Sequence, residues 1–144
     1  MTRPDPEVVR LVEAGELGEA ARLLGRPFEV EGDVVVGERR GRDLGFPTAN
    51  LELAPGQVLP PKGIYVGEAL GRRAAISIGV NPHFGGSVLR VEAHLLDFDG
   101  DLYGKRLVVE LWERLRDERA FASEAELVEA IAADVAAART AVRP

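Results

Sequence analysis

Residues 64–80, with the sequence IYVGEALGRRAAISIGV, decide the fold class of this chain. They contain two short runs rich in apolar and β-branched residues, Ile64–Leu70 and Arg73–Val80. Runs of this length and composition are typical of β-strands. We therefore expect two strands here, and similar patterns lie on both sides of them.

The other strand candidates share short length and boundaries rich in Gly, Pro or Asp. They are Phe28–Gly37, Leu89–Phe98 and Lys105–Leu115, together with residues 47–50, which Pro47 biases toward an extended conformation. The Asp99-Gly100 pair suggests a tight hairpin. About six short strands without intervening helices favour an antiparallel barrel or sandwich over a parallel sheet.

Helical signals occur at both ends of the chain. Residues 5–24 are predicted to form two short helices, with Asp5 as a cap and Pro6 in the first turn. Near the C-terminus, Ser123 and Glu126 form a capping box ahead of an apolar helical face. We expect this last helix to dock against the barrel and to close one of its open ends.

Composition excludes several classes of function. The formal net charge of −6 opposes nonspecific nucleic-acid binding. The chain has no cysteine, which excludes disulfides, thiolate catalysis and Fe–S clusters. It shows neither a signal peptide nor an apolar run long enough for a membrane span. We therefore expect one cytoplasmic domain without nucleic-acid or membrane partners.

Residues 41–50, GRDLGFPTAN, concentrate groups that suit a metal and a phosphate. Thr48 and Asn50 are two positions apart in a segment expected to be extended, so their side chains point the same way. Hydroxyl and amide oxygens suit a hard cation such as Mg²⁺, while Arg42 and backbone N–H groups suit phosphates. The alternative is the edge of an ordinary strand behind a polar turn. Without other context, these ten residues favour that alternative.

Glu92 is the second candidate, because it lies in a largely apolar strand. Alternation places it on the same face as His94, Leu96 and Phe98. A carboxylate in apolar surroundings is costly unless it is paired or used. Glu92 therefore lies on a solvated face, pairs with an arginine, or acts as a general base at the mouth of a barrel. The pattern alone favours the first two.

Arg116 and Phe121 follow the last strand candidate. An arginine and an aromatic ring at this spacing are suited to stacking on a planar ligand. The alternative is a polar approach to the C-terminal helix. No Walker A or G-x-G-x-x-G pattern occurs, so a nucleotide site here would use neither a P-loop nor a Rossmann turn.

Together these motifs resemble the riboflavin kinase family, in the form found as the C-terminal module of bacterial bifunctional FAD synthetases. The matching blocks run in the family's order from about residue 24 to residue 139, which makes the set specific. They are LGRP (24–27), GR and LGFPTAN (41–50), GIY (63–65), SIGVNP (77–82), VEAHLLDF (91–98), DLYG (101–104) and LRDE with Phe121 (115–121).

The resemblance implies a mainly β fold. It implies a six-stranded antiparallel Greek-key barrel with a C-terminal helix over residues 25–144, and short N-terminal helices in residues 1–24. It also implies transfer of the γ-phosphoryl group of ATP, with Mg²⁺, to the terminal ribityl hydroxyl of riboflavin, giving FMN and ADP. The competing hypothesis is a non-catalytic flavin- or nucleotide-binding regulatory module.

The resemblance further suggests that residues 1–24 are the end of a linker to the family's FMN adenylyltransferase domain. That domain would be either a fused or a separate partner, and FAD synthesis is not assigned to these residues. His83 departs from the family, which often has a threonine there.

The resemblance also implies a role for each candidate residue. Thr48 and Asn50 would hold the metal, and Glu92 would accept the ribityl proton. The remaining candidates would bind a substrate. For ATP they are Gly41, Arg42, Gly45, Pro47, Asp97, Phe98 and Tyr103, and for the flavin they are Arg116 and Phe121.

Overall fold

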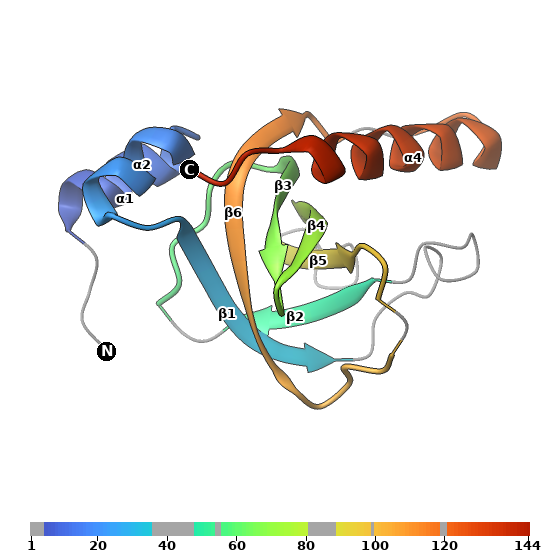
Figure 1. Cartoon of the computed structure of the whole chain (residues 1–144), viewed down its shortest axis with the longest axis horizontal. Helices are drawn as coiled ribbons and strands as arrows, with labels where there is room; N and C mark the ends of the chain where they lie inside the picture. The colour runs from blue at the N-terminus through green and yellow to red at the C-terminus, as the bar shows by residue number, and fades with distance from the viewer. Residues whose placement is uncertain (1–4, 36–47, 54–55, 81–88, 99, 119–120) are drawn as a thin grey trace.

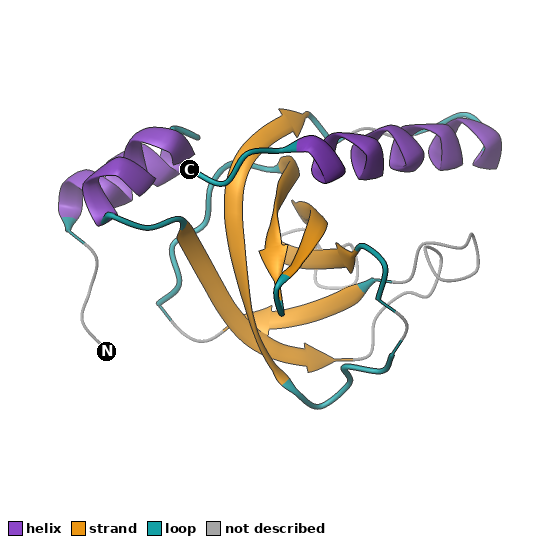
Figure 2. Cartoon of the chain, in the orientation of Figure 1, coloured by secondary structure: helices purple, strands orange, loops and turns teal. Residues whose placement is uncertain are grey.

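In this computed structural model, six antiparallel strands close into a barrel (Figure 1, Figure 2). The structure describes residues 5–35, 48–53, 56–80, 89–98, 100–118 and 121–144. The strands are β1 (Phe28–Val35), β2 (Ala49–Leu53), β3 (Gly63–Ala69), β4 (Arg72–Val80), β5 (Leu89–Leu95) and β6 (Arg106–Arg116). Their order around the barrel is β1-β2-β5-β4-β3-β6.

This order is a Greek key, because β3, β4 and β5 form a meander and β6 returns beside β3. The predicted barrel is confirmed, and the sandwich alternative is wrong. The hairpin predicted at Asp99-Gly100 is also wrong, because β5 pairs with β2 and β4 while β6 pairs with β1 and β3. A tight hairpin instead joins β3 to β4 at Leu70 and Gly71, which have left-handed φ angles of 53° and 73°.

Apolar side chains from alternate positions of the strands fill the barrel interior. In β5, for example, Val91, Ala93 and Leu95 belong to this interior cluster. The two N-terminal helices, α1 (Pro6–Glu13) and α2 (Leu17–Leu24), add Val8 and Leu17 among others to the same cluster. These helices therefore pack onto the core of the barrel.

The C-terminal helix α4 (Glu124–Thr140) lies on the outside of the barrel (Figure 1). Its Ala138 packs with Val66, Leu96 and Trp112 in a second cluster, separate from the interior one. The predicted docking of this helix is confirmed, but the predicted closure of an open end is wrong. The helices that join the interior core are α1 and α2.

The start of α4 is set by its cap. The Ser123 hydroxyl accepts a hydrogen bond from the Glu126 backbone N–H at 3.2 Å, as the capping box predicts. The Glu126 carboxylate accepts from the Ala122 N–H at 3.1 Å and so holds the residue before the cap. Among the described residues, no helix is both long and apolar enough to cross a membrane.

Candidate active site on the outer wall of the barrel

The backbone ladder brings Asn50 and Glu92 together although 42 positions separate them in the sequence. Asn50 of β2 lies directly opposite Glu92 of β5, and Glu92 lies directly opposite Ser77 of β4. Residues opposite each other in neighbouring strands project from the same face of the sheet. Asn50, Glu92 and Ser77 therefore form one polar row. Asn50 is buried, and the Glu92 side chain is 18% exposed.

This row lies on the outer wall of the barrel. The neighbours of Asn50 and Glu92 along their strands, including Leu51 and Val91, belong to the interior cluster. Because side chains alternate along a strand, Asn50 and Glu92 point outward. The expectation that Glu92 acts at the mouth of the barrel is therefore wrong, because it projects from the middle of a strand.

Thr48 is half-buried and stands directly before β2, two positions from Asn50. The residues predicted to lie over ATP from the preceding segment are outside the described residues, and so is His83. These predicted ATP residues are Gly41, Arg42, Gly45 and Pro47, and their roles stay predictions.

Arg90 forms an ion pair with Glu92. Its Nε atom lies 3.0 Å from Glu92 Oε1, on the same face of β5 two positions earlier. This nitrogen is buried, and no acceptor among the described residues meets hydrogen-bond geometry with it. The contact is therefore a charge pairing without an aligned hydrogen bond. Of the alternatives for Glu92, pairing with an arginine is confirmed.

The segment after β6 reaches across to the same place. Arg90 Nη2 lies 3.9 Å from Glu118 Oε1. Both carboxylate oxygens of Glu118 are 2.5 Å from the position that a Cβ atom on Gly79 would occupy, so only glycine there leaves room for the carboxylate. Gly79 in turn lies opposite Arg90 in the β4–β5 ladder. Glu118 thus covers the end of β4 and approaches the Arg90–Glu92 pair.

Arg116 and Phe121, the predicted flavin residues, are brought together. The Arg116 guanidinium carbon lies 5.7 Å from the centre of the Phe121 ring, a cation–π distance. Arg116 Nε and Nη2 donate to the two carboxylate oxygens of Asp134 in α4, at 3.0 and 2.8 Å. Arg116 Nη1 donates to the Asp117 carbonyl at 3.1 Å.

Arg116 belongs to the same rung of the barrel as Glu92. It lies opposite Ile64 of β3, which lies opposite Ser77, the partner of Glu92. Three inter-strand steps separate Arg116 from Glu92, which corresponds to roughly 14 Å along the wall. The rung therefore continues from the polar row through the buried, apolar Ile64 to Arg116, and Phe121 lies beside Arg116.

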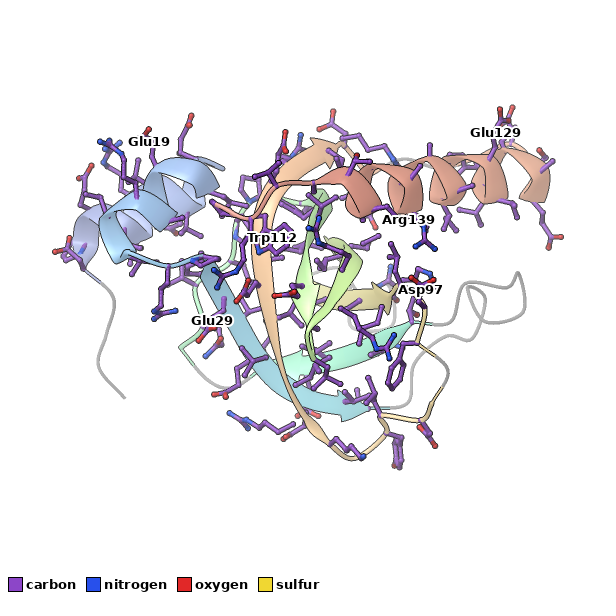
Figure 3. All side chains as sticks on the ribbon, viewed as in Figure 1. Glu19, Glu29, Asp97, Trp112, Glu129 and Arg139 are labelled. Atoms are coloured by element: carbon purple, nitrogen blue, oxygen red, sulfur yellow. The ribbon has the colours of Figure 1, made fainter. Side chains whose placement is uncertain are left out.

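The other described candidates lie in the connection from β5 to β6. The Asp97 carboxylate accepts from the two terminal nitrogens of Arg139 at 2.9 and 3.0 Å (Figure 3), and these hydrogen bonds lower the pKa of Asp97. Phe98 packs against the interior cluster and lies 5.6 Å from the guanidinium carbon of Arg72. The prediction that Phe98 shares the face of Glu92 is wrong, because the strand ends at Leu95 and Asp97 has a φ of 57°.

Tyr103 is 61% exposed, and its N–H donates to Asp101 Oδ1 at 2.9 Å. The next residue, Gly104, donates to the Val34 carbonyl at 2.9 Å. Val34 precedes Val35, which lies opposite Asn50. The β5–β6 connection thus passes along the end of β1 next to the Asn50 end of the polar row.

The sequence interpretation missed Ser77, Arg90, Glu118 and Asp134. Arg90 carried a usable signal, because a residue two positions from Glu92 in a strand shares its face. The contacts of Glu118 and Asp134 join segments that only the tertiary fold brings together.

The oxygen donors at this site suit a metal ion that takes most of its ligands from substrate and water. Within the described parts of the chain, no group of three or more His, Asp or Glu residues could hold a metal ion. Asn50 supplies a neutral oxygen donor directly opposite Glu92, and Thr48 lies two positions before Asn50 in the chain. Mg²⁺ is usually held by one or two protein ligands together with substrate phosphates and water. The described residues therefore fit a divalent ion that arrives with a phosphate ligand.

Asn50, Glu92 and Ser77 thus form a polar row on the outer wall of a Greek-key barrel. Residues 24–142 match the family model for riboflavin kinase, also called flavokinase. The chain is 42% identical over 143 residues to a bifunctional riboflavin kinase/FMN adenylyltransferase from Pseudomonas fluorescens, which covers 96% of this chain and 46% of that protein. The chain thus belongs to the riboflavin kinase family. It spans about half the length of the curated relatives it matches.

Two solved structures share the fold. The crystal structure of a protein described as a macrolide-efflux protein from Streptococcus pneumoniae superimposes with a TM-score of 0.89 at 35% identity, over 96% of this chain and 47% of that chain. The crystal structure of riboflavin kinase from Trypanosoma brucei superimposes with a TM-score of 0.61 at 28% identity, over 79% of this chain and 78% of that chain.

Proposed function

We propose that this chain transfers the γ-phosphoryl group of ATP to the terminal ribityl hydroxyl of riboflavin, producing FMN and ADP. The observation that carries the proposal is the outward-facing pair of Asn50 and Glu92, on a rung that ends at Arg116. Family membership supports the reaction class. The rung supports the division of the site into a phosphate end and a flavin end.

Glu92 acts as the general base. Its carboxylate accepts the hydroxyl proton while the ribityl oxygen forms a bond to the γ-phosphorus, and the bond from that phosphorus to the bridging oxygen of ADP breaks. An aligned base of this kind contributes about 10²–10⁴-fold to the rate. Arg90, whose Nε lies 3.0 Å from Oε1, pairs its charge with this carboxylate.

Thr48 and Asn50 would hold Mg²⁺. The ion would neutralise charge on the transferred phosphoryl group, which is a main requirement of phosphoryl transfer. For ATP itself we retain the other sequence-based candidates as proposals. They are Gly41, Arg42, Gly45, Pro47, Asp97, Phe98 and Tyr103.

Arg116 and Phe121 bind the planar ring of the flavin, at the end of the rung away from Asn50. We assign this chemistry to residues 25–144 and propose that residues 1–24 are a linker, of which α1 and α2 pack on the barrel. An FMN adenylyltransferase domain, fused or separate, is the proposed partner that consumes FMN. Because the reaction draws on ATP, we also propose a cytoplasmic location.

The direct test is incubation of the purified protein with riboflavin and MgATP, followed by chromatographic separation of the flavins. We expect FMN and ADP in equal amounts, and no FMN when the divalent ion is chelated. Tight riboflavin binding without FMN after long incubation would support the non-catalytic regulatory module instead.

A further inference from the structure

Asp134 is a buried acid in α4, a helix that otherwise packs by apolar residues such as Val135 and Ala138. The exposed fraction of Asp134 is 6%. Among the described residues, the buried polar or charged side chains are Asp134 and Asn50 alone. Charged residues are seldom buried unless they are paired. The burial of Asp134 therefore depends on its partner.

Its partner is Arg116, and the geometry is bidentate. Two parallel hydrogen bonds, of 3.0 and 2.8 Å, fix both the position and the plane of the guanidinium. The Phe121 ring lies on that group with its centre 5.7 Å from the guanidinium carbon. A helix, the end of a strand and the segment between them are thus joined through one planar group.

The other ion pairs of the C-terminal region differ from this one. In the Arg139–Asp97 pair both side chains are more than half exposed, and in the Arg143–Glu110 pair the arginine is 53% exposed. Exposed pairs of this kind contribute little to stability. A buried pair is often no more stabilising than apolar side chains of the same volume, so stability alone does not account for Asp134.

We propose that Asp134 is a positioning residue for the flavin. It holds the Arg116 guanidinium in one plane, and through it the Phe121 ring, so that the stacked pair offers a preformed surface to the flavin ring. Side chains that are ordered before binding do not lose conformational freedom when the ligand arrives. This inference rests on the proposed function, because Arg116 and Phe121 are its flavin residues.

The primary test is riboflavin affinity, measured by direct titration without ATP, in wild type and in Asp134→Asn. We expect the dissociation constant to rise about tenfold as two side chains lose their fixed orientation, while the KM for ATP stays within twofold. Arg116→Lys keeps the charge but loses the bidentate geometry, and it should resemble Asp134→Asn. Glu110→Gln, at the Arg143 pair, is the matched control and should leave riboflavin affinity unchanged.

A double-mutant cycle with Phe121→Ala separates positioning from a purely structural role. If Asp134 acts through the stacked pair, Asp134→Asn should add little further loss of affinity to Phe121→Ala. Full additivity would overturn the proposal. So would riboflavin affinity within twofold of wild type in folded Asp134→Asn, or an equal rise in the KM for ATP.

Should Asp134→Asn fail to fold, the pair Asp134→Leu with Arg116→Met removes both charges together and avoids an unpaired buried cation. This variant should fold and still bind riboflavin about tenfold more weakly. Retained affinity would overturn the proposal. Failure of the wild type to form FMN would refute the proposed function separately, because the titration needs no turnover.

Discussion

The two ends of the rung that runs from Asn50 to Arg116 are held in place by different means. At one end, Asn50 and Glu92 are placed by the hydrogen-bond ladder between β2 and β5. At the other end, Arg116 and Phe121 are placed by a side-chain ion pair to α4 and by the segment after β6. The first arrangement depends on backbone register, whereas the second depends on a few side chains that lie far apart in the sequence.

We expect the first end to serve the chemical step and the second end to serve flavin binding. The ladder fixes the position of the proposed base, Glu92, relative to the proposed metal ligand Asn50, and phosphoryl transfer depends on such accurate positioning. At the other end, the bidentate ion pair to Asp134 holds the Arg116 guanidinium in one plane beside the Phe121 ring. Substitutions at the ladder end should therefore lower kcat or metal affinity, and substitutions at the Arg116 end should weaken flavin binding.

The largest expected effect is that of Glu92→Gln at the ladder end. Removing the base should lower kcat by about 10²–10⁴-fold, because the amide cannot accept the hydroxyl proton. The fold and most of the riboflavin affinity should persist. The measurement is the rate of FMN formation at saturating substrates, with Glu52→Gln, an exposed acid on β2, as control. Turnover within a few-fold of wild type would reject Glu92 as the base.

A smaller effect is expected at the proposed metal oxygens. Thr48→Ala should raise the Mg²⁺ concentration for half-maximal rate by about tenfold, and excess Mg²⁺ should restore much of the rate. Activity measured across a Mg²⁺ series at fixed ATP provides the test. An unchanged metal dependence would argue against a metal at this position.

Arg90 links β5 to the segment after β6, because it contacts both Glu92 and Glu118. We expect Arg90→Ala to lower kcat/KM for riboflavin about tenfold, or about 1.4 kcal/mol, since two carboxylates then face each other without a cation. A double-mutant cycle with Glu118→Ala should show that the two losses are not additive. Independent losses would mean that Glu118 does not act through Arg90.

The smallest effect concerns the C-terminal tail, away from both ends. Burial acts to raise the pKa of Glu110, but hydrogen bonds from Arg143 and Trp112 outweigh it and leave this pKa below its ordinary value. A carboxyl pKa that is lower in the folded state than in the unfolded state stabilises the fold at pH values above the unfolded-state pKa, near 4.5. This stabilisation is lost as the pH falls through the folded-state pKa.

Arg143→Ala should therefore reduce the melting temperature by about 1–3 °C at pH 7. The difference from wild type should shrink toward zero as the pH falls below about 4. Thermal unfolding of both proteins across this range measures it. A difference that does not change with pH would assign the effect to lost packing and not to charge.

Local signals in the sequence predicted the elements of the fold but not all of its connections. Strand runs such as Arg73–Val80 and the Ser123 cap depend on nearby residues, and the structure has them as predicted. The Asp99-Gly100 hairpin failed because turn chemistry cannot report which strands become neighbours. The prediction that the last helix closes an open end of the barrel was wrong, because an apolar helix face can pack on the outer wall as well as on an open end.

The same limit applies to the site. The alternation around Glu92 indicated a special carboxylate and a possible arginine partner, and Arg90 is that partner. The pairing of Asn50 with Glu92 is seen only in the structure, because no local rule sets the β2–β5 register; the family resemblance implied a role for each residue. The sequence pattern could not distinguish Asp134 from the other polar residues of the C-terminal helix, because its contact with Arg116 depends on the tertiary fold.

The most direct test is a crystal structure of the protein with riboflavin, ADP and Mg²⁺ bound. The account predicts a flavin lying across the outer wall, with its ring on Phe121 and its terminal hydroxyl within about 3.2 Å of the Glu92 carboxylate. A flavin bound elsewhere, with the Glu92 carboxylate remote from that hydroxyl, would contradict it.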